Sequence, residues 1–85
     1  MASIEIILEA MKRNPRNIAF KDLLKICIYY FGEPRIRGSH HYFTTSWQGH
    51  PIVNIQKLGA QAKPYQVRQV LAAITRLGEE NERSE

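Results

Sequence analysis

An internal disulfide is the first feature that this sequence excludes, because its 85 residues contain a single cysteine. One thiol cannot close a bridge, and the cysteine content gives no sign of an oxidising compartment. Cys27 lies within the mostly apolar run LLKICI of residues 23–28. We therefore expect Cys27 to be a small buried hydrophobe and not a nucleophile.

Long hydrophobic runs are also missing from the chain. No segment approaches the roughly 18 consecutive apolar residues that a membrane-spanning helix needs. Glu5 and Glu9 interrupt the N-terminal region, which therefore does not resemble a signal peptide. From these two absences we predict an intracellular, cytoplasmic protein.

Chain length and charge limit the kind of site that the protein can build. The sequence predicts one domain over residues 1–78 and a polar, disordered tail over residues 79–85, with no internal repeat. Because so small a domain cannot enclose a large cavity, a functional site has to lie on a surface or in a shallow groove. The net charge of +4 favours polyanionic partners, although many unrelated domains carry a similar charge.

Apolar residues recur at helical spacing in three segments. The first predicted helix covers residues 4–13 and follows Ser3, a candidate N-cap. The second covers residues 20–31, and its start should be weak because Ala19 has no side-chain oxygen for a cap. The third covers residues 64–77 and begins with proline, which suits the first turn of a helix.

Between the second and third helices the pattern changes to that of strands. Three short strands are predicted, over residues 33–37, 40–46 and 52–56. Residues 57–63 are predicted to form a loop. The sequence thus predicts an α+β fold, in which helices cover one face of a three-stranded antiparallel sheet and leave the other face open. This layered α-β-β-β-α order, with an extra N-terminal helix, resembles the double-stranded-RNA-binding fold.

The most informative segment is RIRGSHHYF, residues 35–43, in which a glycine-serine turn brings His40 to the start of a strand. Gly38-Ser39-His40, followed by the aromatic Phe43, resembles the signature of the HicA toxins. Those are small mRNA interferases of bacterial type II toxin–antitoxin systems, with a double-stranded-RNA-binding-like fold. The resemblance covers about residues 10–77, since it extends to NPRN, FKDL and AKPYQVRQ at residues 14–17, 20–23 and 62–69.

This resemblance implies that the protein is an endoribonuclease that cleaves mRNA with His40 as its catalytic residue. The implied partner is a HicB-type antitoxin that covers His40 and neutralises the basic face. No cofactor is implied, and the three histidines and single cysteine lack the ligand spacing of a zinc site. The candidate RNA-binding residues are Arg35, Arg37, Ser39, Tyr42, Lys57, Lys63 and Arg68.

Histidine suits this chemistry because RNA carries its own nucleophile, the ribose 2′-hydroxyl. An enzyme has to move a proton and stabilise the charge on phosphorus, and a histidine with a pKa of about 6.5 can act as acid or base at cellular pH. Arg35, Arg37 and Lys57 are candidates to hold the phosphate.

Several aromatic residues have a structural interpretation beside the functional one. His41 is predicted on the opposite strand face from His40, next to Phe43, and in a structural role. His50 is predicted as a turn residue. Tyr42 and Trp47 either stack on RNA bases or pack against the protein.

Two functions of other kinds remain open. One is a non-catalytic RNA-binding module in which His40 is structural, and the other is a decayed toxin that acts only through its antitoxin complex.

This sequence departs from the HicA pattern at one place. Many HicA chains carry a proline and a further histidine near the third strand, whereas residues 55–58 read IQKL in this sequence and include neither. Lys63, Arg68 and Arg76 form either a phosphate-binding flank or an ordinary solvated helix face.

Overall fold

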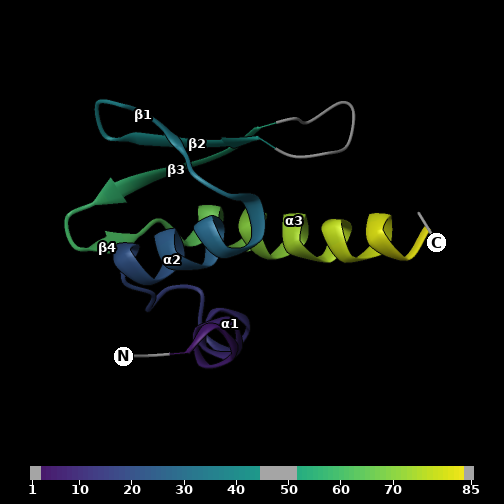
Figure 1. The fold of residues 1–85 in the computed structure, drawn as a ribbon. Helices are drawn as coiled ribbons and strands as arrows, with labels where there is room; N and C mark the ends of the chain where they lie inside the picture. The colour runs from purple at the N-terminus through teal and green to yellow at the C-terminus, as the bar shows by residue number, and fades with distance from the viewer. Residues whose placement is uncertain (1–2, 45–51, 84–85) are drawn as a thin grey trace.

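The computed structural model describes residues 3–44 and 52–83 of the chain. The elements are α1 (Ile4–Arg13), α2 (Phe20–Phe31), β1 (Arg35–Arg37), β2 (His40–Thr44), β3 (Ile52–Leu58), β4 (Gln61–Ala62) and α3 (Pro64–Arg83). The four strands pair antiparallel in the order β1-β2-β3-β4 (Figure 1). The α+β class predicted from the sequence is confirmed, with a four-stranded sheet in place of the three strands expected.

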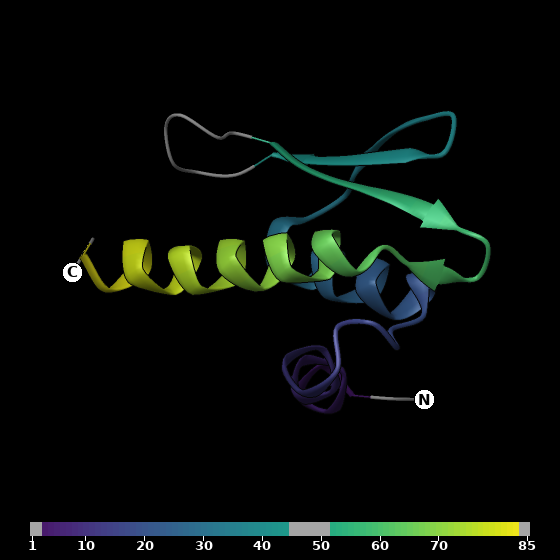
Figure 2. The ribbon, with the colours of Figure 1, turned by 180° about the vertical axis from the view of Figure 1, so that it is seen from behind.

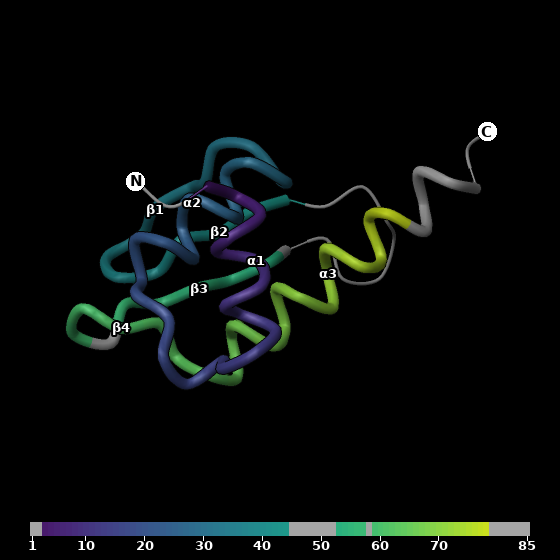
Figure 3. Tube along the Cα trace, turned by 90° about the horizontal axis from the view of Figure 1, so that it is seen from below, coloured from purple at the N-terminus to yellow at the C-terminus, as the bar shows by residue number. Residues whose placement is uncertain are grey.

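The helices lie in two layers on one side of the sheet. Helices α2 and α3 contact β3, and α1 contacts α2 and α3 from the side that faces away from the strands (Figures 1 and 2). Viewed from below, α1 crosses in front of this helix layer, with the sheet behind (Figure 3). None of the three described helices covers the other side of β1, β2 and β3, which we call the helix-free side. Within the described residues, no helix combines the length and the apolar character that crossing a membrane requires.

The core between sheet and helices determines which way each strand residue points. Phe43 of β2 and Ile55 of β3 are fully buried and belong to the same cluster as residues of all three helices. Successive strand residues point to opposite faces, so the neighbours of these two residues point to the helix-free side. Leu23 of α2 and Val67 of α3 are likewise fully buried in this cluster.

The starts of α1 and α2 have the capping that the sequence predicts. The Oγ of Ser3 accepts a hydrogen bond from the N–H of Ile6 at 3.2 Å and caps α1. Ala19 gives α2 no side-chain cap. Instead, the N–H of Phe20 donates to the carbonyl of Ala60 at 3.0 Å, which ties the start of α2 to the turn between β3 and β4.

Two strand boundaries differ from the sequence prediction, and one strand was not predicted. Strand β1 begins at Arg35 and not at residue 33, because Pro34 has no N–H for the ladder. The predicted loop over residues 57–63 is wrong, since it contains the end of β3 and the whole of β4. A two-residue strand is too short to show an alternating pattern. Residues 45 and 46, predicted to end the second strand, lie outside the described residues.

The predicted end of the third helix at residue 77 is also wrong, because α3 continues through Gly78 to Arg83. Gly78 does not have the positive φ that glycine adopts when it ends a helix. Residues 79–83, predicted as disordered tail, therefore belong to α3, and residues 84 and 85 lie outside the described residues.

We expect Gly78→Ala to stabilise the protein. A Cβ at Gly78 would meet no atom within 4 Å, and alanine is favoured over glycine inside a helix by roughly 0.5–1 kcal/mol. The melting temperature should rise by about 2–8 °C for a domain of this size. The control is Gly38→Ala, which should lower the melting temperature because Gly38 has φ of 58°. A lower melting temperature for Gly78→Ala would contradict the helical assignment at this position.

Candidate functional site

A tight turn between β1 and β2 sets the position of His40. Gly38 has φ of 58°, and Ser39 has no positive φ, which is the pattern of a type II′ hairpin turn. Arg37 and His40, on either side of the turn, are direct partners in the β1–β2 ladder. The glycine-serine turn predicted from the sequence therefore does bring His40 to the first position of a strand.

Six side chains form two rows across the helix-free side of β1, β2 and β3. Partners in an antiparallel ladder point to the same face, so each row continues from strand to strand. One row holds Arg37, His40 and Gln56, and the other holds Arg35, Tyr42 and Asn54. We call the surface formed by these six residues the His40 face.

The ring of His40 is held by two neighbours and remains half-buried. Its Nδ1 lies 3.2 Å from the Oδ1 of Asn54 on the adjacent strand. Its plane lies 17° from that of the Tyr42 ring, with the two centroids 5.9 Å apart. The prediction that Tyr42 shares a face with His40 is thus confirmed, whereas its stacking on an RNA base remains a prediction.

Gln56 connects the His40 face with the start of α3. Its Nε2 donates to the Oγ of Ser39 at 3.1 Å, and its Oε1 accepts from the Nζ of Lys63 at 2.7 Å. Its backbone N–H donates to the Oε1 of Gln66 at 2.8 Å, just where the β3–β4 ladder has ended. Lys63, predicted to share a helix flank with Arg68 and Arg76, is therefore held at the edge of the row that contains His40.

The charged residues of the His40 face and of the four strands are all cationic. Arg35 and Arg37 lie on β1, Lys63 reaches Gln56, and strands β1 to β4 contain no aspartate or glutamate. The sequence has no acidic residue between Glu33 and Glu79. Its cations in that interval are Arg35, Arg37, Lys57, Lys63, Arg68 and Arg76. The net charge of +4 does not show this uneven distribution, but the spacing of the acidic residues along the sequence does.

The structure does not bring Lys57 together with Arg35 and Arg37, although all three were predicted to hold one phosphate. Lys57 follows Val53 and Ile55 at intervals of two along β3, so it is directed to the side that the helices occupy. There it lines a pocket of about 500 Å³ together with His41. Arg68 is exposed on α3, and none of the described contacts links it to the His40 face.

His41 lies on the helix side of β2, as predicted. Its ring centroid is 5.1 Å from that of Phe20, and the two rings are inclined by 60°. Its Nδ1 is buried and has no hydrogen-bond partner among the described residues. This contact with α2 agrees with the structural role expected for His41. Two further candidates, Trp47 and His50, lie outside the described residues.

Asn54 and Gln56 are the two members of the His40 face that the sequence analysis missed. Both alternate with the apolar Val53 and Ile55 within the predicted third strand. Polar residues at a spacing of two beside buried ones indicate the solvent-facing side of a strand. The signal for a shared face was therefore present, but the hydrogen bonds that the two amides make could not be predicted from it.

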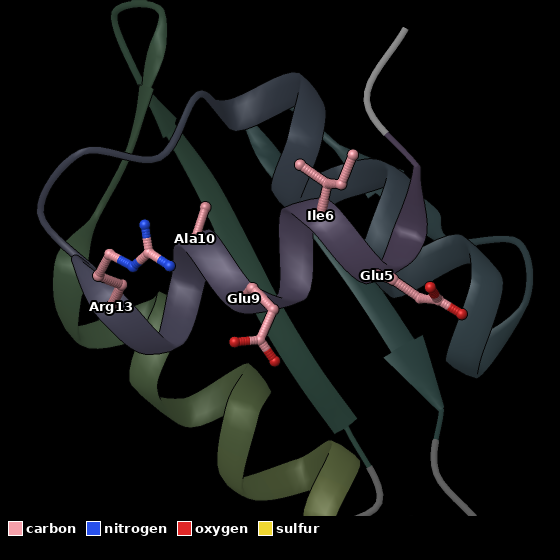
Figure 4. Close-up of a pocket in the computed structure, with 5 residues that line it drawn as sticks. All are labelled: Glu5, Ile6, Glu9, Ala10 and Arg13. Atoms are coloured by element: carbon pink, nitrogen blue, oxygen red, sulfur yellow. The ribbon is translucent and has the colours of Figure 1, made fainter.

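A second hollow, of about 370 Å³, lies on α1 and is far from these residues. It is lined by Glu5, Ile6, Glu9, Ala10 and Arg13, all of one helix (Figure 4). Because α1 packs on the side of α2 and α3 that faces away from the sheet, this hollow contains none of the predicted site residues. Across residues 3–44 and 52–83, no three His, Cys, Asp or Glu side chains cluster in a way that could hold a metal ion.

Comparisons with protein-family models, with curated proteins and with solved structures found no match to this chain. The resemblance of residues 38–40 to the HicA signature therefore stays a prediction.

Cys27 is the one thiol in the sequence, and its position agrees with the prediction that it is no nucleophile. Its side chain is fully buried in α2, and this burial raises the pKa of the thiol from 9.0 to about 12. The thiolate is the reactive form of cysteine, so Cys27 stays neutral and unreactive in the folded protein at neutral pH.

We expect part of the free energy of unfolding to be lost as the pH rises from about 9 towards 12. The folded thiol keeps its proton in this range, whereas the thiol of the unfolded chain, with its ordinary pKa of 9.0, gives it up. The unfolded state then binds fewer protons, and stability falls with pH. Urea unfolding between pH 7 and 10.5 measures this slope. Cys27→Ala is the control, because it lacks the thiol but keeps every other titrating group, and equal slopes in both proteins would contradict the prediction.

Proposed function

We propose that this chain is an endoribonuclease that cleaves single-stranded RNA by metal-independent transesterification, with His40 as general acid and base. One observation carries the proposal. His40 lies on the helix-free side of the sheet as the ladder partner of Arg37 on β1 and of Gln56 on β3, and Gln56 accepts a hydrogen bond from Lys63. An accessible histidine among cations, on strands without carboxylates, suits a phosphodiester substrate.

The reaction needs one proton taken up and one given back. As the 2′-oxygen attacks phosphorus, neutral His40 accepts the proton of the 2′-hydroxyl. The bond between phosphorus and the 5′-oxygen breaks, and the leaving oxygen takes a proton from the imidazolium or from water. The products are a 2′,3′-cyclic phosphate and a 5′-hydroxyl. Arg37, the ladder partner of His40, would hold the non-bridging oxygens through its planar guanidinium.

The resemblance to HicA toxins extends this proposal to a biological role. In that role the chain is the toxin of a type II toxin–antitoxin pair in the cytoplasm, and mRNA is its substrate. A HicB-type antitoxin would cover His40 and neutralise the cations around it. The order α2-β1-β2-β3-α3 is compatible with a double-stranded-RNA-binding-like fold to which α1 and the short β4 are added. In the proposed role Ser39, Tyr42 and Arg68 would also contact RNA.

We expect His40→Ala to lower the rate of RNA cleavage by at least about a hundredfold, the scale of a lost general acid or base. The melting temperature should change little, because the side chain lies on the helix-free side of the sheet. Cleavage is measured in excess chelator, with detection of the cyclic phosphate product. His41→Ala is the matched control, and it should cost stability but little rate because its ring packs on Phe20. Wild-type cleavage by His40→Ala would refute the assignment of His40.

Arg37→Gln and Arg68→Gln should separate catalysis from simple binding. Arg37 lies beside His40, so its loss should lower the maximal cleavage rate. Arg68 lies outside the His40 face, so its loss should weaken RNA affinity and flatten the log–log salt dependence by about 0.7 without changing that rate. Single-turnover kinetics and binding titrations at several salt concentrations give both quantities. If wild type and variants bind RNA and none cleaves it, the chain is a binding module.

A further inference from the structure

We propose that Asn54 is a positioning residue that fixes the tautomer of His40, so that Nε2 is the atom that exchanges protons with the RNA. The catalytic consequence rests on the proposed nuclease function. The tautomer itself is a property of the folded protein and can be measured without any substrate.

Asn54 reaches His40 diagonally across the ladder between β2 and β3. The ladder partner of Asn54 is Tyr42, and that of His40 is Gln56, two residues further along the same strand. Diagonal neighbours on one face of an antiparallel pair come within reach of longer side chains. Here the Oδ1 of Asn54 lies 3.2 Å from the Nδ1 of His40. Buried Val53 and Ile55 flank Asn54, so the backbone that carries the amide is held by the core.

The direction of this hydrogen bond follows from the chemistry of its two atoms. An amide oxygen has lone pairs and no hydrogen, so it can only accept. Nδ1 must then be the donor, and a neutral imidazole carries only one N–H. Nε2 is therefore left with a free lone pair, which is the form that a general base requires. In an unrestrained neutral histidine the proton prefers Nε2, so the contact with Asn54 selects the less common tautomer.

Tyr42 gives the ring a second restraint. Its ring stacks against that of His40 at an angle of 17°, while Asn54 holds the Nδ1 edge. A half-turn of the His40 ring would place a carbon against the oxygen of Asn54 and lose the hydrogen bond. The amide is also neutral, so it orients the ring without stabilising the imidazolium as a carboxylate partner would.

The first test is the tautomer itself, measured through the ¹⁵N chemical shifts of the His40 ring at a pH where the ring is neutral. In the wild-type protein we expect the proton on Nδ1. Asn54→Ala should move it to Nε2 in most molecules, and Asn54→Asp should return it to Nδ1 because an acceptor oxygen is restored. Gln56→Ala is the matched control, because Gln56 lies on the same face of β3 but bonds to Ser39 and Lys63. Its His40 shifts should remain those of the wild type.

The second test is cleavage. Asn54→Ala should lower kcat by roughly 10–100-fold, the scale known for groups that orient metal-ligating histidines, with little change in KM. Asn54→Asp should recover part of the rate and shift the activity profile to higher pH, since its carboxylate raises the pKa of His40.

The outcomes distinguish this proposal from the nuclease proposal. A wild-type ring protonated on Nε2, or unchanged shifts in Asn54→Ala, would overturn the role of Asn54 even if His40 is essential for cleavage. If the variants fold poorly, the position of the proton in the wild-type ring still tests the proposal, because a proton on Nε2 would overturn it. If the tautomer depends on Asn54 but no RNA is cleaved, the positioning of the ring stands and the nuclease function is wrong.

Discussion

The two-residue period of β2 and β3, with helices on only one side, decides which of their side chains are buried and which face away from the core. Phe43 and Ile55 are fully buried against α2 and α3, and this burial fixes the register of both strands. A slip by one residue would turn His40 and Asn54 into the core and expose Phe43. Burying unpaired polar groups and losing the burial of an aromatic ring would each cost a few kcal/mol, on the order of 2–3. The packing of the core therefore positions the residues of the helix-free side.

A glycine turn at one end and a side-chain hydrogen bond at the other fix this arrangement where apolar packing does not reach. At one end, the positive φ of Gly38 reverses the chain so that Arg37 and His40 face each other. At the other end, Gln66 is only 3% exposed and satisfies the N–H of Gln56 beyond the last β3–β4 pair. Leaving that N–H without a partner would cost about 1–3 kcal/mol. Helix α3 is thus attached to β3 by a directed bond as well as by its apolar face.

The sequence was sufficient for features that depend on periodicity and on single strong residues. The three helices, the weak cap at Ala19, the turn at Gly38 and the opposite faces of His40 and His41 all follow from such local signals. Features that depend on pairing could not be read in the same way. Strand β4 is defined by the pairing of residues 61–62 with the end of β3, and two residues show no period of their own. The end of α3 was missed for another reason: glycine often ends a helix, but Gly78 has no positive φ and the helix continues to Arg83. The separation of Lys57 from the arginines could have been predicted by applying the strand period beyond residue 56.

The polar partners on the His40 face are neutral, and this choice has an electrostatic consequence. Asn54 holds His40, and Gln56 holds Lys63 and Ser39, through amide groups. A carboxylate at either position could accept from His40 or from Lys63, but it could not donate to Ser39 as the Gln56 amide does, and its charge would offset one of the cations on this surface. An amide orders its neighbours without that loss, so the side chains are positioned while the positive potential is kept. On this open sheet face, neutral supports therefore hold the His40 ring and the Lys63 side chain without reducing the positive charge of Arg35, Arg37 and Lys63.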